Sequence, residues 1–424
     1  MNDATGSAAK IVRGDNSAQA FDVARVRADF PILSQTVYGR PLVYLDSAAS
    51  AQKPRQVIEA MTQSYETCYA NVHRGVHRMS QLATDAFEGG REKVAKCMNA
   101  GSADEVVFTR NATEAFNLIA SCFGLVHLGT GDEIVISTLE HHANIVPWQL
   151  LRERLGVVIR VVPIDDQGNF LLDEYEALLG PRTKLVAVTH VSNALGTVVP
   201  VKRVIDLAHA RNIPVLIDGC QAAPHMAIDV RALNADFYIF TGHKVYGPTG
   251  IGVLYGKRDL LNALPPYQGG GEMIASVTFE KTTFKEAPHR FEAGTPPIVE
   301  VIGLGAAIDY VTGLEQDAIA AHEAGLRSYA EERLSGVRGV RLIGTAKEKA
   351  SIVSFVMDNA HPHDIGTIVD RAGVAVRTGH HCAQPLMERL DVTATARASI
   401  GLYNTRADID TLAEALESVS EIFG

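Results

Sequence analysis

The sequence predicts an α/β protein with two domains: a large domain built on a mainly parallel sheet with helices on both faces, then a smaller α+β domain. Three observations support this fold class. The chain has 424 residues, more than one average domain. Its strand-like runs are continuously apolar, which is typical of parallel strands buried on both faces. Amphipathic runs with helical spacing of apolar residues lie between them.

The large domain is expected over residues 35–307, where short apolar runs bounded by Gly, Asp or Pro alternate with longer amphipathic runs. The runs expected to form strands are 42–46, 104–109, 132–138, 157–165, 184–191, 214–219, 236–242 and 250–255. The runs expected to form helices are 111–124, 144–156, 172–180 and 201–212.

The smaller domain is expected to combine residues 21–34 with residues 308–424. A long helix beginning with the run 299–314 should lead out of the large domain. Five further runs then predict the order strand, helix, strand, strand, helix, which suits an α+β domain; they are 350–358, 363–373, 374–379, 394–403 and 406–423. The polar residues 1–20 lack the apolar core of a signal peptide and are predicted to form a mobile tail.

Charge and cysteine content exclude several classes of protein. The net charge of -10, with no Lys/Arg-rich run, argues against a nucleic-acid or anionic-membrane partner. No apolar run approaches the roughly 20 residues needed to cross a bilayer. The odd number of scattered cysteines is not a disulfide framework and favours a reducing, cytoplasmic location; they are Cys68, Cys97, Cys122, Cys220 and Cys382.

A lysine and an aspartate at neighbouring strand ends predict a cofactor site. Lys244 follows the strand 236–242, where a buried ammonium is costly unless it is paired or used covalently, as in a Schiff base with an aldehyde cofactor. Asp218 ends the preceding strand, at the sheet edge where open α/β folds bind ligands. An Asp beside a pyridine nitrogen keeps it protonated, which makes pyridoxal phosphate an electron sink. A surface lysine and an ordinary turn aspartate are the alternatives.

Two further segments suit that cofactor. Asn111, Ala112 and Thr113 open a helix, whose free N–H groups favour a phosphate, although an ordinary helix cap explains them equally well. His141 follows the strand 132–138 at the same edge, where an imidazole could lie flat on a pyridine ring. The run EHHAN lacks the HExxH spacing of a zinc helix, so no metal is expected.

The motifs NVHRGVHRMS, RNATEAFNLIA, EHHANIVPW, THVSNALGT, IDGCQA, TGHKVYGPTGIG, RFEAGTP and RTGHHCAQPL occur in this order from about residue 21 to the C-terminus. Together they resemble the class V aminotransferase-type enzymes that use pyridoxal 5'-phosphate and, more narrowly, the Suf-type (group II) cysteine desulfurases. The resemblance implies the PLP-dependent transferase fold type I, with a mainly parallel seven-stranded sheet. It also implies a homodimer whose sites are completed across the two-fold interface.

By this resemblance, Cys382 is the sulfur acceptor: L-cysteine becomes L-alanine and its sulfur is left on Cys382 as a persulfide. The thiolate is the reactive form, and a neighbouring imidazolium or arginine favours it. His380, His381 and Arg377 are positioned to do so. The alternatives are a structural cysteine in a tight turn and a His-His-Cys metal site, for which no fourth ligand has suitable spacing.

The resemblance also assigns roles to the other motif residues. Lys244 would carry the cofactor as a Schiff base and move the α-proton, Asp218 would pair with the pyridinium nitrogen, Gln221 would bond the ring hydroxyl, and His141 would stack on the ring. The residues expected near the phosphate are Ala112, Thr113, Thr241 and His243, with Thr295 reaching in from a second subunit. Those expected to hold the substrate are Arg397, which would clamp its carboxylate, Asn193, Arg377 and His73.

The sequence leaves several functions open. Cys382 lies only five residues beyond Arg377, a short loop that favours a SufE- or SufU-like acceptor protein inserting its own thiol, on the way to iron–sulfur cluster assembly. Selenocysteine lyase is a close alternative, because selenium leaves L-selenocysteine readily without Cys382. Another lyase or aminotransferase would make Cys382 incidental. A non-catalytic sulfur-transfer scaffold is disfavoured by the intact Lys244, Asp218 and His141 set.

Overall fold

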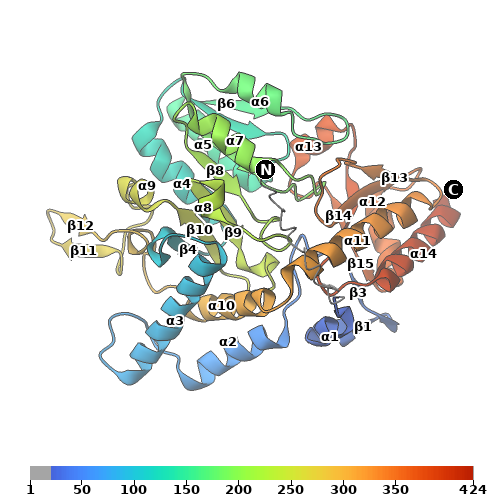
Figure 1. Ribbon diagram of the computed structural model, residues 1–424, viewed down its shortest axis with the longest axis horizontal. Coiled ribbons are helices and arrows are strands. Elements are labelled where there is room, and N and C mark those ends of the chain that lie inside the picture. Colours follow the sequence, from blue (N-terminus) through green and yellow to red (C-terminus); the bar gives the residue numbers. More distant parts are fainter. Residues whose placement is uncertain (1–20, 424) are drawn as a thin grey trace, which may run out of the picture.

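The structure, a computed structural model, describes residues 21–423, so the predicted tail at 1–20 lies outside the described residues. A seven-stranded sheet forms the centre of the molecule, in the order β4-β10-β9-β8-β7-β5-β6 (Figure 1). Only β10 runs antiparallel to its neighbours β4 and β9. The strands are β4 (Val106–Thr109), β5 (Glu133–Ser137), β6 (Val158–Val162), β7 (Thr183–Thr189), β8 (Val215–Asp218), β9 (Phe237–Thr241) and β10 (Gly252–Gly256).

Helices cover both faces of this sheet, as the sequence predicts, because successive residues of the apolar strands point to opposite sides. In β5, Ile134 and Ile136 pack with Phe116 and Trp148 in one core, whereas Val135 belongs to a second core. The helices and 3-10 turns of this part are α2 (Arg55–Thr67), α3 (Arg78–Cys97), η2 (Ala103–Glu105), α4 (Ala112–His127), η3 (His142–Asn144), α5 (Val146–Leu155), α6 (Leu172–Leu178), α7 (Val201–His209), α8 (Val230–Leu233), η4 (Gly242–Lys244), α9 (Arg258–Ala263), η5 (His289–Phe291) and α10 (Ile298–Thr312).

The C-terminal part forms a four-stranded antiparallel sheet in the order β13-β14-β17-β16. Four of the five predicted runs form the expected element, but the run 374–379 forms two short strands in different sheets. The helix at Gln384–Arg389 was also missed, as was the edge strand β13, whose residues are mostly half-buried and carry an arginine. The elements are α11 (Gln316–Ser335), β13 (Val340–Ile343), β14 (Ile352–Met357), α12 (Pro362–Arg371), β15 (Val374–Ala375), β16 (Arg377–Gly379), α13 (Gln384–Arg389), β17 (Thr395–Ser399) and α14 (Arg406–Phe423).

Two segments differ from the simplest interpretation of the sequence. The predicted strand at 42–46 contains β3 (Val43–Tyr44), which pairs in parallel with β15 instead of joining the seven-stranded sheet. An apolar run alone does not specify which sheet a strand joins. The long helix expected from 299 onward is two helices, because Gly313 ends α10 and α11 begins only at Gln316.

The remaining elements lie near the N-terminus and in a hairpin that projects from the large sheet (Figure 1). They are α1 (Val23–Ala28), η1 (Pro31–Ser34), β1 (Thr36–Val37), β2 (Arg40–Pro41), and the hairpin strands β11 (Ile274–Val277) and β12 (Thr282–Phe284). Within residues 21–423, no helix combines the length and apolar character needed to cross a bilayer. The α/β fold class, with a mainly parallel seven-stranded sheet and a smaller C-terminal sheet, is confirmed.

Candidate active site

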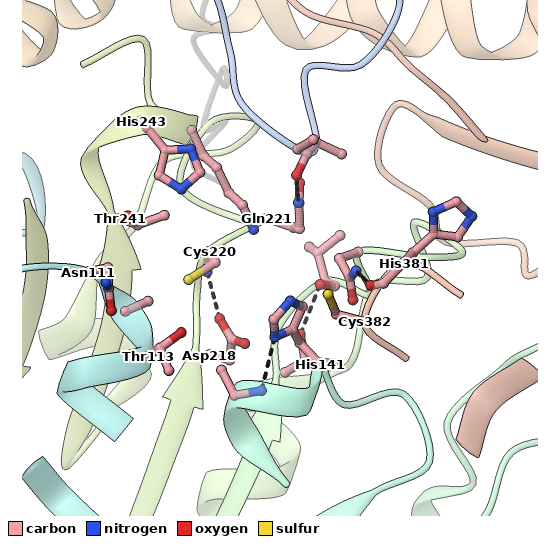
Figure 2. A pocket seen from close by; sticks show the side chains of 18 of the residues that line it. Asn111, Thr113, His141, Asp218, Cys220, Gln221, Thr241, His243, His381 and Cys382 are labelled. Carbon is pink, nitrogen blue, oxygen red and sulfur yellow. Dashed lines mark hydrogen bonds between the residues drawn. The ribbon is translucent and has the colours of Figure 1, made fainter. Parts of the chain in front are cut away.

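A cavity of about 340 Å³ lies where the carboxyl ends of β7, β8 and β9 meet the segments around β16 and β17 (Figure 2). This is the edge at which open α/β sheets bind ligands. It gathers most of the residues that the sequence singles out; those lining it are Ala112, Thr113, His141, Asn193, Asp218, Gln221, Thr241, His243, Lys244, Arg377, Cys382 and Arg397.

Two residues predicted to contact the cofactor or the substrate lie outside the cavity of the single chain, and the exposed His380, expected to act on Cys382, does not line it either. The ring nitrogen Nε2 of His73 is 2.8 Å from Oε1 of Glu88, and neither residue lines the cavity. Thr295 is exposed and lines a separate hollow together with Phe291. The structure of one chain therefore does not bring these two side chains to the site.

Asp218 and Gln221 are fixed at the end of β8. Oδ1 of Asp218 accepts a hydrogen bond of 2.9 Å from the N–H of Cys220, and the carboxylate is buried. Gly219 allows this tight turn, since a Cβ there would lie 1.9 Å from the ring of Tyr238. Nε2 of Gln221 donates to the carbonyl of Ala48 at 2.6 Å, which leaves its buried Oε1 without a partner among the described residues. A buried acceptor in that state suits a hydroxyl of a bound group.

Lys244 lies in the 3-10 turn η4, directly after β9. The neighbouring His243 is largely buried, and this burial together with the positive charge of Lys244 lowers the pKa of His243 to about 4. His243 is therefore neutral at neutral pH. Thr241 is the last residue of β9, with its hydroxyl 3.3 Å from the carbonyl of Ile251. The strand end thus presents an amine, a hydroxyl and a neutral imidazole to one cavity.

The first turn of α4 forms the part of the wall beside Thr241 (Figure 2). Asn111 caps the helix, because its Oδ1 accepts from the N–H of Glu114 at 2.9 Å. Gly252 of β10 lets the helix start approach the sheet, since a Cβ there would lie 2.4 Å from the carbonyl carbon of Asn111. Ala112 and Thr113 face the cavity, where free N–H groups of a helix N-terminus favour an anion such as a phosphate.

His141 lies between Asp218 and Cys382 (Figure 2). Its Nδ1 accepts a hydrogen bond of 3.0 Å from the N–H of Ala143, so Nε2 is the nitrogen that carries the proton. Burial and the charge of Lys244 lower the pKa of His141 to about 4. A neutral imidazole held at this edge suits stacking on an aromatic ring.

A buried carboxyl group behind His141 was missed in the sequence. Glu140 is fully buried, and Oε2 accepts from Nδ2 of Asn144 at 2.7 Å while Oε1 accepts from the N–H of Thr189 at 3.0 Å. Asn144 in turn accepts from Nε1 of Trp148 at 2.9 Å. Burial raises the pKa of Glu140 to about 8. This network joins the ends of β5 and β7, and so fixes the backbone that carries His141.

The loop that carries Cys382 is tightly held. His381 and Cys382 both adopt the left-handed conformation, with φ of 54° and 55°, which costs roughly 1–3 kcal/mol each for residues other than glycine. The carbonyl of Cys382 accepts from the N–H of His142 at 2.7 Å, and Nδ2 of Asn193 donates to the carbonyl of His381 at 2.6 Å. Cys382 is nevertheless exposed. The strained backbone therefore holds a thiol at the mouth of the cavity.

His381 does not supply positive charge to this thiol. Its side chain is buried, and burial together with the charges of Arg397 and Arg377 lowers the pKa of His381 to about 3. Its Nε2 lies 2.8 Å from the hydroxyl of Thr395. The guanidinium groups that line the same cavity as this thiol are those of Arg377 and Arg397.

Arg397 is buried, with 2% of its side chain exposed. Nη1 donates to the carbonyl of Asn193 at 2.7 Å and Nη2 to Oδ1 of Asp46 at 3.2 Å. Its Nε is buried without a partner among the described residues, so a donor remains free for a ligand carboxylate. Burial lowers the pKa of Arg397 to about 10. Asp46 was missed in the sequence, although, like Asp218, it directly follows an apolar run.

The cavity lining matches the needs of pyridoxal phosphate. It offers an amine for the aldehyde, a carboxylate for the ring nitrogen, an unpaired amide oxygen for the ring hydroxyl and a helix start for the phosphate.

Comparison with known proteins agrees with this chemistry. A family model described as aminotransferase class-V matches residues 43–412. The chain belongs to this family. Members of the family depend on pyridoxal phosphate, which confirms the predicted cofactor.

Within the family, the chain belongs to the cysteine desulfurases. It is 51% identical to a cysteine desulfurase of Enterobacter sp. (strain 638), over 96% of this chain and 100% of that protein. It is 52% identical to a probable cysteine desulfurase of Mycolicibacterium paratuberculosis over 95% of this chain, but spans only 59% of that relative's length. The crystal structure of the cysteine desulfurase CsdA from Escherichia coli superimposes with a TM-score of 0.89 at 39% identity, covering 96% of this chain and 100% of that one.

Proposed function

We propose that this chain converts L-cysteine to L-alanine and takes up the released sulfur as a persulfide on Cys382, supplying sulfur for iron–sulfur cluster assembly. The observation that carries the proposal is the position of Cys382. An exposed thiol is held on a strained, hydrogen-bonded loop at the mouth of the cavity that also contains Lys244, Asp218 and Arg397.

In this proposal, the large sheet holds the cofactor. Lys244 binds its aldehyde carbon, Asp218 its ring nitrogen and Gln221 its ring hydroxyl, while His141 lies against the ring. The residues proposed near the phosphate are Ala112, Thr113, Thr241 and His243. Bound pyridoxal phosphate supplies an electron sink for charge that develops on the substrate carbon.

The substrate is held by groups from the C-terminal sheet. The free Nε of Arg397 and the guanidinium of Arg377 bind the α-carboxylate, with Asn193 beside them. Lys244 then moves the α-proton. The Cys382 thiolate attacks the substrate sulfur: an S–S bond forms, and the Cβ–S bond breaks with its electron pair left on carbon. Cβ takes up one proton, which the substrate thiol has given up, and the α-proton held by Lys244 returns to Cα; these two protonations complete alanine.

Replacing Cys382 by alanine tests this assignment. Wild type should release alanine and, with a mild reductant, an equal amount of sulfide from L-cysteine. The variant should lose both by roughly 100-fold or more, because the nucleophile is gone, while the visible absorbance of the cofactor persists. Cys68→Ala, which removes a cysteine outside the cavity lining, is the matched control.

The same variant separates the alternative functions. A selenocysteine lyase would keep its rate on L-selenocysteine when Cys382 is replaced, because selenium leaves without a thiol nucleophile. A lyase or aminotransferase of this fold would keep its rate on L-cysteine as well. Unchanged release of sulfur from L-cysteine by Cys382→Ala would therefore overturn the proposal.

Delivery of the sulfur is proposed to need a SufE- or SufU-like acceptor protein. The loop between Arg377 and Cys382 is short, and its backbone is bonded to His142 and Asn193. A loop held in this way has little reach, so the acceptor thiol must come to Cys382. All five cysteines are free, which supports a reducing, cytoplasmic location.

A homodimer is also proposed. On the β11–β12 hairpin, Phe279 in the turn is fully exposed, Val277 next to the turn is largely exposed, and Phe284 at the base is partly exposed. The hairpin projects from the large sheet (Figure 1). Exposed apolar residues grouped on a projecting element mark an interaction surface.

Sedimentation analysis should show a dimer for wild type. Phe279→Glu should raise the dissociation constant roughly tenfold or more, since buried aromatic contacts each contribute about 1–2 kcal/mol or more. Leu125→Glu, which changes an exposed leucine on α4, is the control. A dimer of unchanged affinity in Phe279→Glu would rule out the hairpin as the interface.

A further inference from the structure

The loop that carries Cys382 leads directly into a short helix that has no cap of its own. This helix, α13, begins at Gln384, and the residue at its cap position is Ala383, whose side chain has no hydrogen-bond acceptor. The first N–H groups of a helix have no partner within the helix. The start of α13 therefore needs an acceptor from another part of the chain or from water.

His142, at the edge of the large sheet, supplies this acceptor. Its Nε2 accepts a hydrogen bond of 3.1 Å from the N–H of Gln384. Its own backbone N–H donates to the carbonyl of Cys382 at 2.7 Å. One residue thus holds the Cys382 turn at two points, on either side of Ala383. Only a neutral imidazole has a ring nitrogen free to accept, and burial together with the neighbouring His380 lowers the pKa of His142, which favours this form.

The segment after β5 therefore contacts both the cofactor site and the sulfur-acceptor loop. His141 lines the cavity and lies beside Cys382 (Figure 2). The next residue, His142, does not line the cavity and contacts the loop instead. The backbone at His381 and Cys382 is left-handed, a conformation that persists only where surrounding contacts hold it. Loss of one of these contacts should let the loop relax.

We propose that His142 is a positioning residue for sulfur transfer: its side chain holds the Cys382 loop in place relative to the cofactor, so that the thiol meets the substrate sulfur. This inference rests on the proposed function and adds a residue to it. Only the step in which Cys382 takes up sulfur should depend on His142, whereas movement of the α-proton by Lys244 should not. A displacement of a reacting group by about 1 Å can slow a reaction roughly 100-fold.

Two measurements with the cofactor-loaded enzyme separate these steps. Exchange of the Cα proton of L-alanine for deuterium, followed by NMR, requires Lys244 and the cofactor but no thiol. The single-turnover rate of persulfide formation from L-cysteine requires Cys382 as well. In His142→Ala, persulfide formation should slow about tenfold or more, while the exchange of L-alanine should stay within about twofold of wild type. The retained exchange also shows that the variant is folded.

Two further variants identify the hydrogen bond as the cause. His142→Gln places an amide oxygen near the position of Nε2 and should keep most of the wild-type rate of persulfide formation. His142→Phe keeps a ring but has no acceptor, and should be as slow as His142→Ala. His361→Ala is the matched control, because Nδ1 of His361 also accepts a backbone N–H at a helix start, that of His363, but is exposed and does not line the cavity. Both of its rates should equal those of wild type.

Amide hydrogen exchange of the peptide 380–386 provides a readout that does not depend on turnover. It should be several-fold faster in His142→Ala and His142→Phe than in wild type and His142→Gln. Wild-type amide exchange or persulfide formation in His142→Phe, a slow His142→Gln enzyme, or an equal loss of both rates in His142→Ala would overturn the inference. The proposed function is judged separately: it fails if wild type forms no persulfide, and the amide exchange then still tests the contact between His142 and the loop.

Discussion

Lys244→Ala is expected to lower the rate of alanine formation from L-cysteine at least 1,000-fold, since it removes both the covalent anchor of the cofactor and the group that moves the α-proton. The cofactor should also be lost on prolonged dialysis. Treating the wild-type enzyme with borohydride before digestion should leave the cofactor attached to one peptide, the one that contains Lys244.

Lys53 is the control lysine for this experiment. Its ammonium lies 3.0 Å from the carbonyl of His243, and burial lowers its pKa to about 8, so it is a second amine near the site that could react with an aldehyde. It does not line the cavity. Reduced cofactor attached to Lys53, or a Lys244→Ala enzyme of near-normal rate, would contradict the assignment.

Arg397→Lys should raise the KM for L-cysteine about 10- to 100-fold, with a smaller effect on kcat. Lysine keeps the charge but not the planar fork, so the hydrogen bonds to Asn193, Asp46 and the substrate cannot all be made. Each hydrogen bond to a charged group contributes about 1.5–3 kcal/mol, which corresponds to this change in KM. Steady-state kinetics over a range of L-cysteine concentrations provides the measurement.

Arg389→Lys is the matched control, because Arg389 also pairs with a backbone carbonyl and an aspartate, Ile164 and Asp166, but on the surface. Its KM should stay within about twofold of wild type, as expected for an exposed ion pair. If Arg397→Lys lowers kcat while KM is unchanged, Arg397 does not hold the substrate carboxylate.

The sheet and the positions of Asp218, Lys244 and His141 at its edge were predictable because the relevant signals are local. The apolar runs 214–219 and 236–242 each form one strand, and parallel strands end at one edge, so Asp218 and the Lys244 turn after β9 had to lie near each other. The same reasoning placed His141 after β5. Placing these residues at the sheet edge requires no knowledge of long-range strand pairing beyond the direction in which the strands run.

Features that depend on long-range contacts could not be predicted. Asp46 meets the two arginines only because β3 pairs with β15, more than three hundred residues along the chain, which no local pattern indicates. The neutral state of His381 depends on its burial beside Arg397. In the sequence, Glu140 looks like an ordinary charged residue before His141. Only the folded structure shows that it is buried among Ser137, Asn144 and Thr189.

The most direct test of the account is the mass of the Cys382 peptide after one turnover. The cofactor-loaded enzyme is mixed with one equivalent of L-cysteine without reductant, quenched with an alkylating reagent and digested. The account predicts one additional sulfur atom on the Cys382 peptide, in an amount equal to the alanine formed. Alanine formed with the extra sulfur on Cys68 or Cys97, or on no cysteine, would contradict it.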